Sequence, residues 1–286
     1  GDGSFPEDIE ELFPSFRKYR TIGIQTSRGC RNRCIYCTYP ILEGRKLRPR
    51  KPEQVAQEME ILSGKYGKRD FFIVDSLFNA SEVHLLQVLE EILRLGLDIQ
   101  FSCYLQPRIS DTSIIGLLKR AGCVAIDFGT DSGSMKMLLS MNKGFIQEDI
   151  RKASAACTGE GIDFSHSLIF GGPGETRETI RETVKLMDEV SPRAVVAMTG
   201  VRIYPGTEME MIARREGYIS EGESLLSPHF YFSGLGTDGL IREVRSAVGS
   251  RRNWFFPGEL DRSASVCHRL LYFLYRNGPL WRTFKK

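Results

Sequence analysis

Three cysteines that lie close together are the residues of this chain best suited to chemistry. Cys30, Cys34 and Cys37 have the spacing Cys-x3-Cys-x2-Cys. Three thiolates can hold three irons of a four-iron, four-sulfur cluster, whereas electron-transfer clusters are usually closed by a fourth cysteine. The remaining iron is then open to bind a substrate or cofactor. The spacing therefore predicts a cluster that performs chemistry rather than one that only carries electrons.

Zinc binding and disulfide formation are the alternative uses of these cysteines. A structural zinc site normally has four ligands, and the nearest further candidates, Cys103 and His84, lack zinc-binding spacing. A disulfide framework is typical of small secreted chains, whereas here seven cysteines are spread over 286 residues. The iron–sulfur cluster is therefore the favoured interpretation.

The composition indicates an ordinary globular protein. Hydrophobic residues make up 41% of the chain and charged residues 26%, with a formal net charge of +3, which gives no reason to expect nucleic-acid binding. We interpret the basic run Arg45–Lys51 as a solvated loop. No apolar stretch approaches the ~20 residues needed to span a bilayer. We therefore expect a soluble, cytoplasmic protein in which thiols stay reduced.

Segments with strand and helix patterns alternate along the chain and must position the cysteines. The predicted strands are 22–26, 70–75, 99–105, 124–129, 162–170 and 194–201. The main predicted helices are 52–65, 81–95, 111–121 and 176–190. We expect Ser81 and Asp111 to cap their helices. The apolar stripe expected to be buried in helix 81–95 consists of Val83, Leu86, Leu89, Ile92 and Leu93.

Six strand–helix steps predict a parallel sheet with right-handed crossovers. In barrels built this way the reactive groups gather at the carboxyl ends of the strands, and the cysteine loop follows the first predicted strand. A doubly wound open sheet is the alternative, but no Gly-x-Gly-x-x-Gly fingerprint follows that strand. The pattern therefore predicts an α/β fold with the cysteines at one edge of the sheet.

The surroundings of the cysteines carry a family resemblance. Residues 25–30 fit a strand end that passes into a glycine-containing turn, and Tyr36 immediately precedes Cys37. The motif resembles Cys-x3-Cys-x-aromatic-Cys, the hallmark of the radical S-adenosylmethionine (SAM) superfamily. The resemblance implies a [4Fe–4S] cluster whose open iron is chelated by SAM. It further implies reductive cleavage of SAM to a 5′-deoxyadenosyl radical, which abstracts a hydrogen atom from the substrate.

The resemblance also implies a domain organisation. Residues 19–217 would form a partial (β/α)6 TIM-like barrel, and residues 218–286 a C-terminal aromatic and helical extension. Helices are expected near Ile241–Arg251 and Ala264–Arg276. In similar proteins such extensions close the open side of the barrel and shape the substrate pocket.

Three further segments match elements of the family, two of them at places where it contacts SAM. Asp75 and Ser76 follow the second predicted strand, where relatives hold the amino group of SAM, although the sequence here differs from the usual Gly-Gly-Glu. Ser132, after the fourth strand, corresponds to a contact with the ribose and carboxylate. Lys143 matches a recurring downstream element. The resemblance assigns these residues to cofactor binding together with Tyr36.

Two later segments resemble the elements that contact adenine. Phe170, Gly172 and Glu175 lie in a loose match to Gly-x-Ile-x-Gly-x-x-Glu at the end of the fifth strand. Tyr204 and Pro205 follow the sixth strand. Glycine lets a backbone approach a planar ring closely. A purely structural turn is the alternative explanation for each match.

Three residues are weaker candidates for handling the substrate. By strand alternation, His166 shares a face with Phe170 and is expected to point into the barrel. Cys103 and Tyr104 lie at the end of the third strand, where either could donate a hydrogen atom. A satisfied core histidine and inert packing of a buried cysteine remain the alternatives. The catalytic residue is left unassigned.

The N-terminal segment resembles a linker. Residues 1–18 are similar to the segment that follows a cobalamin-binding domain in cobalamin-associated members, although no Asp-x-His-x-x-Gly motif occurs here. The resemblance implies either the catalytic part of a larger cobalamin-dependent protein or a relative that has lost the domain. A flavodoxin- or ferredoxin-type reductant is expected from the family as a partner.

Three functions follow from these expectations. The first is a radical SAM enzyme of the cobalamin-associated branch, a methyltransferase or carbon-skeleton modifier acting on a small metabolite such as a lipid-like compound. The second is cobalamin-free oxidation or decarboxylation, as in oxygen-independent coproporphyrinogen oxidase. The third is a cluster-carrying scaffold without turnover. Methylthiolation of RNA or protein is less favoured, because no second cysteine triad is visible.

Overall fold

A seven-stranded sheet forms the centre of the computed structural model, which describes residues 9–220, 222–256 and 278–283. Neighbouring strands all pair in parallel. In order across the sheet they are β1 (Thr21–Ile24), β4 (Asp70–Ile73), β5 (Gln100–Leu105), β6 (Cys123–Asp131), β7 (Asp163–Phe170), β8 (Ala194–Thr199) and β11 (Trp254–Phe255). This order never reverses along the chain, as it would in a doubly wound sheet. The fold is therefore that of a partial TIM-like barrel, as predicted.

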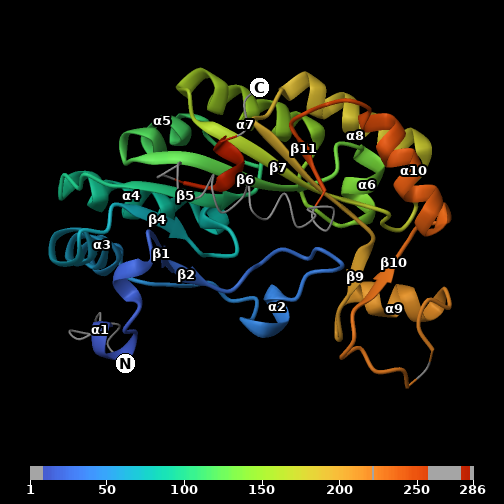
Figure 1. The fold of residues 1–286 in the computed structure, drawn as a ribbon, viewed down its shortest axis with the longest axis horizontal. Coiled ribbons are helices and arrows are strands. Elements are labelled where there is room, and N and C mark those ends of the chain that lie inside the picture. Colours follow the sequence, from blue (N-terminus) through green and yellow to red (C-terminus); the bar gives the residue numbers. More distant parts are fainter. Residues whose placement is uncertain (1–8, 221, 257–277, 284–286) are drawn as a thin grey trace.

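Helices cover one side of this sheet in an arc (Figure 1). We call the face of the sheet toward them the outer face, and the opposite face the inner face. The helices are α3 (Pro52–Tyr66), α4 (Glu82–Arg94), α5 (Ser113–Arg120), α6 (Met135–Ser140), α7 (Gln147–Glu160), α8 (Arg177–Val190) and α10 (Gly236–Val248). The outer face carries large apolar side chains such as Phe71, Phe101 and Phe128. Their burial against the helices supplies the main core.

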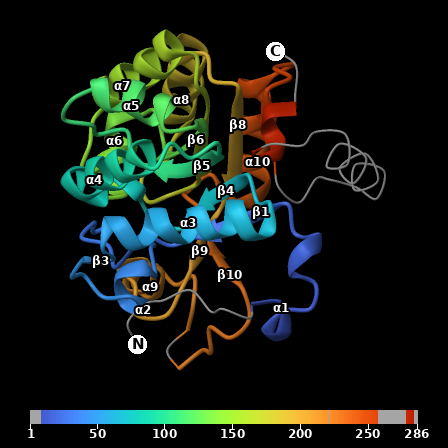
Figure 2. The same cartoon turned by 90° about the vertical axis from the view of Figure 1, so that its left-hand side faces the viewer.

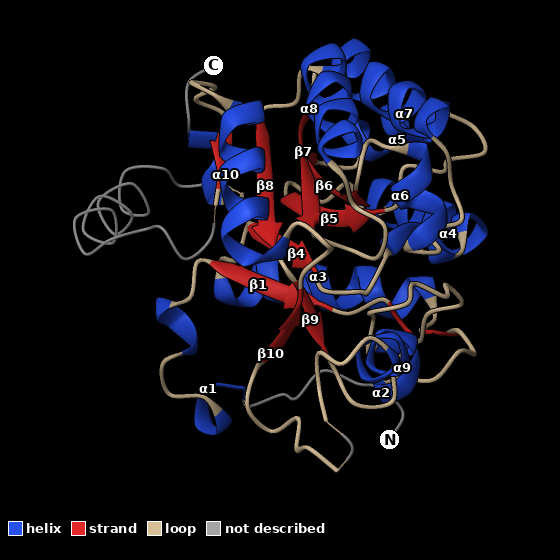
Figure 3. Cartoon of the chain, turned by 90° about the vertical axis from the view of Figure 1, so that its right-hand side faces the viewer, coloured by secondary structure: helices blue, strands red, loops and turns tan. Residues whose placement is uncertain are grey.

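Two small antiparallel strand pairs and several short elements surround the main sheet. β9 (Val201–Ile203) pairs with β10 (His229–Tyr231) in an antiparallel ribbon that stands away from the main sheet (Figures 2 and 3). β2 (Ser27–Arg28) pairs with β3 (Arg48–Pro49). The remaining short elements are α1 (Ile9–Leu12), α2 (Tyr39–Leu42), α9 (Glu208–Arg215) and 3₁₀ turns at Phe16–Lys18, Phe78–Ala80 and Leu280–Thr283.

The sixth predicted strand is divided in the structure. β8 ends at Thr199, and β9 begins after Gly200, whose φ is +86°. A Cβ atom at Gly200 would lie 2.8 Å from the Phe232 ring, so this turn favours glycine on both grounds. The sheet also gains a seventh strand, β11, that was not predicted.

The predicted apolar stripe of α4 was partly wrong. Val83 is 68% exposed, whereas Leu85 and Val88 are fully buried with Leu89 and Ile92. Positions 85, 88, 89 and 92 follow the helical spacing of three and four residues. Because residues 85 and 86 are both leucine, the sequence is compatible with either stripe. Packing against the sheet determines which stripe is buried. Ser81 does cap α4, as predicted, by accepting a hydrogen bond from the His84 backbone.

The other predicted helices agree closely with the structure. Asp111 accepts a hydrogen bond from the Ser113 backbone, so it supports the start of α5 although Thr112 is the capping position. The helix expected near Ile241–Arg251 corresponds to α10, which begins earlier, at Gly236. The helix expected at Ala264–Arg276 lies outside the described residues.

The last described segment packs against the inner face at the amino ends of the strands. Trp281 contacts the layer formed by Ala125 and Ala194, and its indole N–H donates to Asp127 Oδ1 at 2.8 Å. Arg282 forms a 2.9 Å ion pair with Asp163. The barrel is thus filled at this end, while the cysteine loop lies at the carboxyl ends of the strands. No helix within the described ranges is long and apolar enough to cross a bilayer.

Candidate functional site

The cysteine loop is held to its neighbours by backbone hydrogen bonds. Cys30 N–H donates to the Gly44 carbonyl at 3.1 Å, and Gly29 N–H donates to the Glu43 carboxylate at 3.0 Å. Gly29 has a φ of +93°, and a Cβ atom there would lie 2.3 Å from the Lys46 carbonyl oxygen. Only glycine fits this position without moving the backbone. The turn before Cys30 is therefore built around Gly29.

All three cysteines of the loop are free thiols. Cys30 is buried, whereas Cys34 and Cys37 are half-buried. Burial raises the pKa of Cys34 to about 11, although the Lys143 ammonium opposes this shift. Burial also raises the pKa of Cys37. Metal binding would therefore have to displace protons from these thiols.

The donor set fits a cluster with three protein ligands. The other described cysteines, Cys103, Cys123 and Cys157, are buried in the core away from the loop. No described cysteine is therefore placed as a fourth ligand. Across the same described residues, no three His, Cys, Asp or Glu side chains already form a metal-binding group. The fit rests on thiol chemistry and on the shared loop, not on a preformed ligand geometry.

A buried charged network lies beside the loop. Lys143 Nζ is 2.6 Å from Asp131 Oδ2 and donates to the Tyr36 hydroxyl at 3.2 Å. The Tyr36 hydroxyl donates in turn to Asp131. Burial alone would lower the pKa of Lys143, but the Asp131 carboxylate and Cys34 raise it on balance. Lys143 therefore stays protonated and connects the loop to the end of β6.

Asp131 is the member of this network that sequence reasoning missed. The segment after the fourth strand was recognised, but its role was given to the next residue, Ser132. Ser132 is buried, and its hydroxyl contacts Thr183 Oγ1 at 2.9 Å and accepts from the Ser134 backbone. The structure thus brings Asp131, rather than Ser132, to the cysteine loop. The backbone of Asp131 has a φ of +64°, which is uncommon for a residue other than glycine and is visible only in the structure.

Asp75 and Ser76 both lie against the segment that leads to Cys30. Asp75 accepts from Thr26 N–H at 2.7 Å and from Thr26 Oγ1 at 2.6 Å. Ser76 Oγ donates to the Gly29 carbonyl at 3.4 Å. These contacts fix the approach to the loop. Asp75 therefore positions the loop in this structure, and a contact with SAM stays a prediction for both residues.

In the turn after β7, the residues predicted to contact adenine instead contact neighbouring parts of the chain. The buried Glu175 carboxylate accepts from the Gly171 N–H at 3.2 Å and from the Thr179 hydroxyl. Burial raises the pKa of Glu175. A Cβ atom at Gly172 would lie 2.8 Å from the Met141 sulfur, so this glycine allows α6 to pack closely. Both residues shape the turn, and their contact with adenine stays a prediction.

His166 and Phe170 share a face of β7, as predicted, but that face points to the helices and not into the barrel. Phe170 packs on the outer face, with its ring stacked near Trp254 at 6.3 Å between centroids, and Ile169 occupies the inner face beside Tyr36. His166 also points to the outer face, where Thr130 Oγ1 lies 2.6 Å from Nδ1. A shift of one residue along a strand exchanges its two faces. Phe170 therefore does not reach the inner face, where adenine was expected.

His166 is a satisfied core histidine. Ser154 Oγ lies 3.1 Å from its Nε2, so both ring nitrogens have partners. Burial lowers the pKa of His166 to about 3. The ring is therefore neutral at physiological pH, which agrees with the alternative of a satisfied core histidine. Only its expected orientation into the barrel was wrong.

Cys103 and Tyr104 point to opposite faces of β5. Cys103 is fully buried in the outer core, where Cys123 and burial raise its pKa, so its expected position near the reaction centre was wrong. Tyr104 lies on the inner face with its ring 5.1 Å from that of Phe72, and it is 41% exposed. Tyr104 thus remains a candidate for contact with a substrate.

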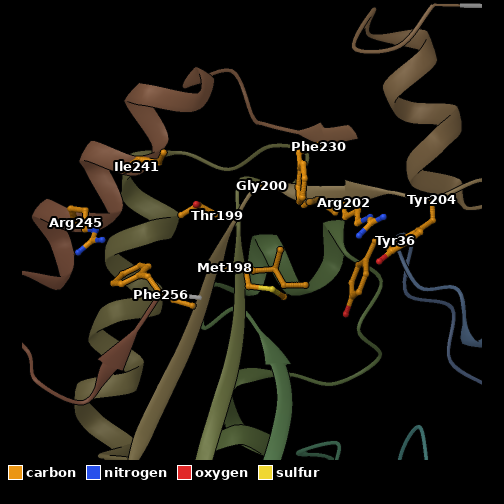
Figure 4. Close-up of a pocket in the computed structure, with 13 residues that line it drawn as sticks. Tyr36, Met198, Thr199, Gly200, Arg202, Tyr204, Phe230, Ile241, Arg245 and Phe256 are labelled. Atoms are coloured by element: carbon orange, nitrogen blue, oxygen red, sulfur yellow. The ribbon is translucent and has the colours of Figure 1, made fainter. Parts of the chain in front are cut away.

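A cavity of about 710 Å³ opens beside the cysteine loop (Figure 4). It is bounded by Tyr36 from the loop, by the carboxyl end of β8, by the β9–β10 ribbon and by α10. Tyr204, a predicted residue, lines it, whereas its neighbour Pro205 is exposed outside. The lining residues not predicted from the sequence are Ile169, Ala197, Met198, Thr199, Gly200, Val201, Arg202, Phe230, Ile241, Arg245 and Phe256.

Comparison with known proteins identifies the family. A model described as the radical SAM superfamily matches residues 24–187, which is more than half of the chain's 286 residues. The chain therefore belongs to the radical SAM superfamily. This membership agrees with the three-cysteine loop and the partial barrel.

Two kinds of curated relative are similar in sequence. Tryptophan 2-C-methyltransferase from Streptomyces laurentii is 31% identical over 208 residues, which are 67% of this chain and 35% of that protein. The tRNA-2-methylthio-N(6)-dimethylallyladenosine synthase from Lachnoclostridium phytofermentans is 30% identical over 198 residues, or 64% of this chain and 42% of that protein. The chain thus spans less than half the length of these relatives.

The fold is similar to that of a solved methyltransferase. TsrM from Kitasatospora setae, with tryptophan and a SAM analogue bound, aligns with a TM-score of 0.80 at 23% identity, covering 94% of this chain and 62% of that one. TsrM with cobalamin and a [4Fe-4S] cluster bound aligns with a TM-score of 0.66 at 26% identity, covering 89% and 53%. These alignments cover more of the chain than the family match to residues 24–187 does.

Proposed function

We propose that this chain is the catalytic part of a cobalamin-dependent radical SAM methyltransferase that acts on a small molecule. The observation that carries this proposal is the position of the three-cysteine loop, whose Tyr36 forms one wall of a mainly apolar cavity. A reactive centre on the loop would face a chamber of about 710 Å³, within the usual size range of small-molecule sites.

The similarity to methyltransferases supports this branch of the superfamily. The relative from Streptomyces laurentii is named as a tryptophan methyltransferase, and TsrM is described with cobalamin and a [4Fe-4S] cluster bound. The chain spans only part of each of these proteins. We infer that cobalamin would be supplied by a domain outside this sequence.

Cys30, Cys34 and Cys37 would hold the cluster in this proposal. When bound, a cluster with one open iron supplies a coordination site for SAM and the electron that drives its reductive cleavage. The chain's own residues fix the loop around this chemistry. Gly29 allows the tight turn before Cys30, and Asp75 ties the preceding segment to the end of β4.

The network of Tyr36, Asp131 and Lys143 holds the far side of the loop. The charge of Lys143 lowers the pKa of both Cys34 and Cys37, although burial is the larger effect. A fixed ammonium group favours negative charge on nearby thiolates. We therefore assign Lys143 a positioning and electrostatic role. The apolar walls of the cavity would exclude water from a reactive intermediate.

Methylthiolation of tRNA is the second candidate, because synthases of that kind are similar at 30% identity. Cobalamin-free oxidation and a non-catalytic scaffold are further alternatives. The scaffold is disfavoured because it has no use for a cavity beside the cluster loop. Cobalamin dependence and the methylated product separate the remaining candidates. A flavodoxin- or ferredoxin-type reductant and a cytoplasmic location belong to the same proposal, since the free thiols and the cluster need a reducing compartment.

The test is anaerobic reconstitution with iron and sulfide, followed by reduction with SAM and methylcobalamin present. L-Tryptophan, other small apolar acids and a tRNA stem-loop would be offered as substrates, and products identified by chromatography and mass spectrometry. A methylated small molecule that requires cobalamin is expected. Turnover of tRNA to a methylthio product, or turnover without cobalamin, would contradict the proposal.

A further inference from the structure

The inner face of the sheet is open immediately after Asp127 on β6. The next residue of β6 on that face is Gly129, and a Cβ atom built there would meet nothing within 4 Å. Gly129 pairs with Ser167 on β7, and Ser167 pairs with Val196 on β8. All three residues are half-buried. Glycine and serine therefore leave space on the inner face, on the side of Asp127 toward the carboxyl ends of the strands.

Only one carboxylate oxygen of Asp127 is engaged by the chain. Oδ1 accepts from the Trp281 indole N–H at 2.8 Å and from the Ser165 hydroxyl. Oδ2 accepts no hydrogen bond from the described residues, and it is not completely enclosed by them. Asp127 retains 8% exposure. Because Trp281 packs at the amino ends of the strands, this exposure is toward the open space at Gly129.

The Asp127 carboxylate forms no ion pair with a positively charged group of the described residues. Arg282, which follows Trp281, pairs with Asp163 at 2.9 Å. Burial raises the pKa of Asp127 to about 6, so the carboxyl group is mostly ionised above pH 7. A buried carboxylate gains more from a hydrogen-bonded counter-charge than from a neutral donor. Its surroundings therefore favour a ligand group that carries positive charge.

Aromatic side chains border the same space. Tyr104 on β5 pairs with Asp127 on β6, so both side chains project from the inner face at the same level. The Tyr104 ring is exposed and meets the Phe72 ring edge-to-face at 5.1 Å between centroids. Burial and the Asp127 charge both raise the pKa of Tyr104, so its hydroxyl is neutral. A carboxylate beside aromatic rings suits an ammonium group attached to an apolar body.

We propose that the substrate is a small apolar molecule that carries an ammonium group, and that the Asp127 carboxylate binds this group. The inference rests on the proposed function, because it takes the barrel interior next to the cysteine loop as part of the substrate site. It names a substrate class and a binding residue for that site.

The strands connect Asp127 to the cysteine loop. Asp131, which contacts Tyr36, follows Asp127 by four residues on β6, a span of about 13 Å. On β7, the residue that follows Ser167 on the inner face is Ile169, which lines the 710 Å³ cavity. A molecule whose ammonium group lies at Asp127 therefore directs its apolar body toward Ile169 and Tyr36. The reacting carbon then lies at the end nearest the cysteines.

Small probes that differ in charge test this assignment. At pH 8, 2-phenylethylamine is protonated, 2-phenylethanol is its neutral counterpart and 3-phenylpropanoate is its anionic counterpart. Each would be titrated into the full, anaerobically reconstituted chain, with binding measured by calorimetry. The parent chain is expected to bind the ammonium probe more tightly than the other two. Asp127→Asn should weaken binding of the ammonium probe roughly tenfold, the effect of losing a hydrogen bond between charged groups, and leave the alcohol unchanged.

Two further variants separate charge from shape. Asp238→Asn is the matched control, because it removes an exposed carboxylate on α10, and it should bind all probes as the parent does. Gly129→Val fills the space beside Asp127 without changing a charge, and a β-branched residue suits a strand. We expect it to weaken binding of the ammonium probe severalfold.

Three results would overturn the proposal. The first is a parent chain that does not bind the ammonium probe, or that binds it no more tightly than the alcohol. The second is an Asp127→Asn chain that retains the parent's affinity, or an equal loss of affinity in Asp238→Asn. The third is unchanged binding of the ammonium probe in Gly129→Val.

Probe binding is measured without turnover, so the two proposals can fail separately. A chain that binds the ammonium probe through Asp127 but never cleaves SAM keeps the ammonium site and loses the proposed function. A chain that methylates a small molecule, but in which Asp127→Asn binds the ammonium probe normally, keeps the function and loses this inference.

Discussion

Lys143 Nζ lies 2.6 Å from Asp131 Oδ2, and both side chains are more than nine-tenths buried. The pair joins the segment after α6 to the end of β6, and the Tyr36 hydroxyl contacts both of its members. Tyr36 directly precedes Cys37. The geometry of the cysteine loop is thereby connected to the end of the central strand of the sheet.

Removing one partner of this pair should destabilise the chain strongly. Lys143→Met leaves the buried Asp131 carboxylate without its counter-charge, which typically costs about 3–5 kcal/mol of unfolding free energy. Urea unfolding under anaerobic conditions measures the change. Lys152→Met is the matched control, because Lys152 is 65% exposed and its ion pair is 4.0 Å long. Equal effects of the two substitutions would contradict a structural role for Lys143.

Gly29→Ala should impair assembly of the cysteine loop. A Cβ atom there would lie 2.3 Å from the Lys46 carbonyl oxygen, and the φ of +93° disfavours any L side chain. We expect iron and sulfide incorporation to fall severalfold after reconstitution. Gly64→Ala in α3, where a Cβ atom meets nothing within 4 Å, should incorporate iron normally. Normal loading of Gly29→Ala would show that the turn tolerates a side chain.

Asp127 should make the stability depend on pH. Burial raises the pKa of Asp127 to about 6, so the folded state binds this proton more tightly than the unfolded state. Its contribution is fully present below the unfolded pKa of about 4 and is lost as pH rises through about 6, a difference of about 3 kcal/mol. Urea unfolding of the parent and Asp127→Asn at pH 5 and pH 8 measures this effect.

The Asp127→Asn chain should lose less stability between those two pH values than the parent chain. Asp238→Asn, which changes an exposed carboxylate on α10, should leave the parent's pH dependence in place. If Asp127→Asn and the parent show the same difference between pH 5 and pH 8, Asp127 titrates normally in the folded chain.

The segment around Trp281 should contribute to stability through Asp127. Trp281→Phe retains an aromatic ring but removes the indole N–H that donates to Asp127 Oδ1 at 2.8 Å. Loss of this bond to a buried group should cost about 1–3 kcal/mol. Comparison with Trp254→Phe, whose ring packs against Phe170, separates the hydrogen bond from the loss of ring area. The loss in Trp281→Phe should be larger at pH 8 than at pH 5, because the carboxylate is then charged.

Much of the fold follows from the pattern of apolar residues. Buried parallel strands such as Asp70–Ile73 are nearly continuous apolar runs, and their regular alternation with helices is visible in the sequence. The orientation of β7 was not predictable in the same way. Asp163, Ser165 and Ser167 share the inner face with Ile169, whereas Phe164, Leu168 and Phe170 share the outer face, so the alternation itself is visible in the sequence. The error was to aim the apolar face at the barrel interior, whereas in the structure it packs against the helices.

The part of the site that lies within one short stretch of sequence was predictable. The three cysteines and Tyr36 fall within a single short motif, whereas Arg202 and Arg245 line the same cavity only because the ribbon and α10 border it. Asp131 was missed because its partner Lys143 lies twelve residues away and Tyr36 lies in another loop. Contacts of this kind depend on tertiary structure, which spacing alone does not reveal.

In the proposed function, Cys30, Cys34 and Cys37 hold a cluster with an iron open to SAM. The most direct test is electron paramagnetic resonance of the reconstituted, reduced chain, recorded before and after addition of SAM. We expect a [4Fe–4S] signal that changes when SAM binds, that is lost in the Cys30→Ala, Cys34→Ala and Cys37→Ala chains, and that persists in Cys157→Ala. A signal that SAM leaves unchanged, or one that survives loss of any of the three cysteines, would contradict it.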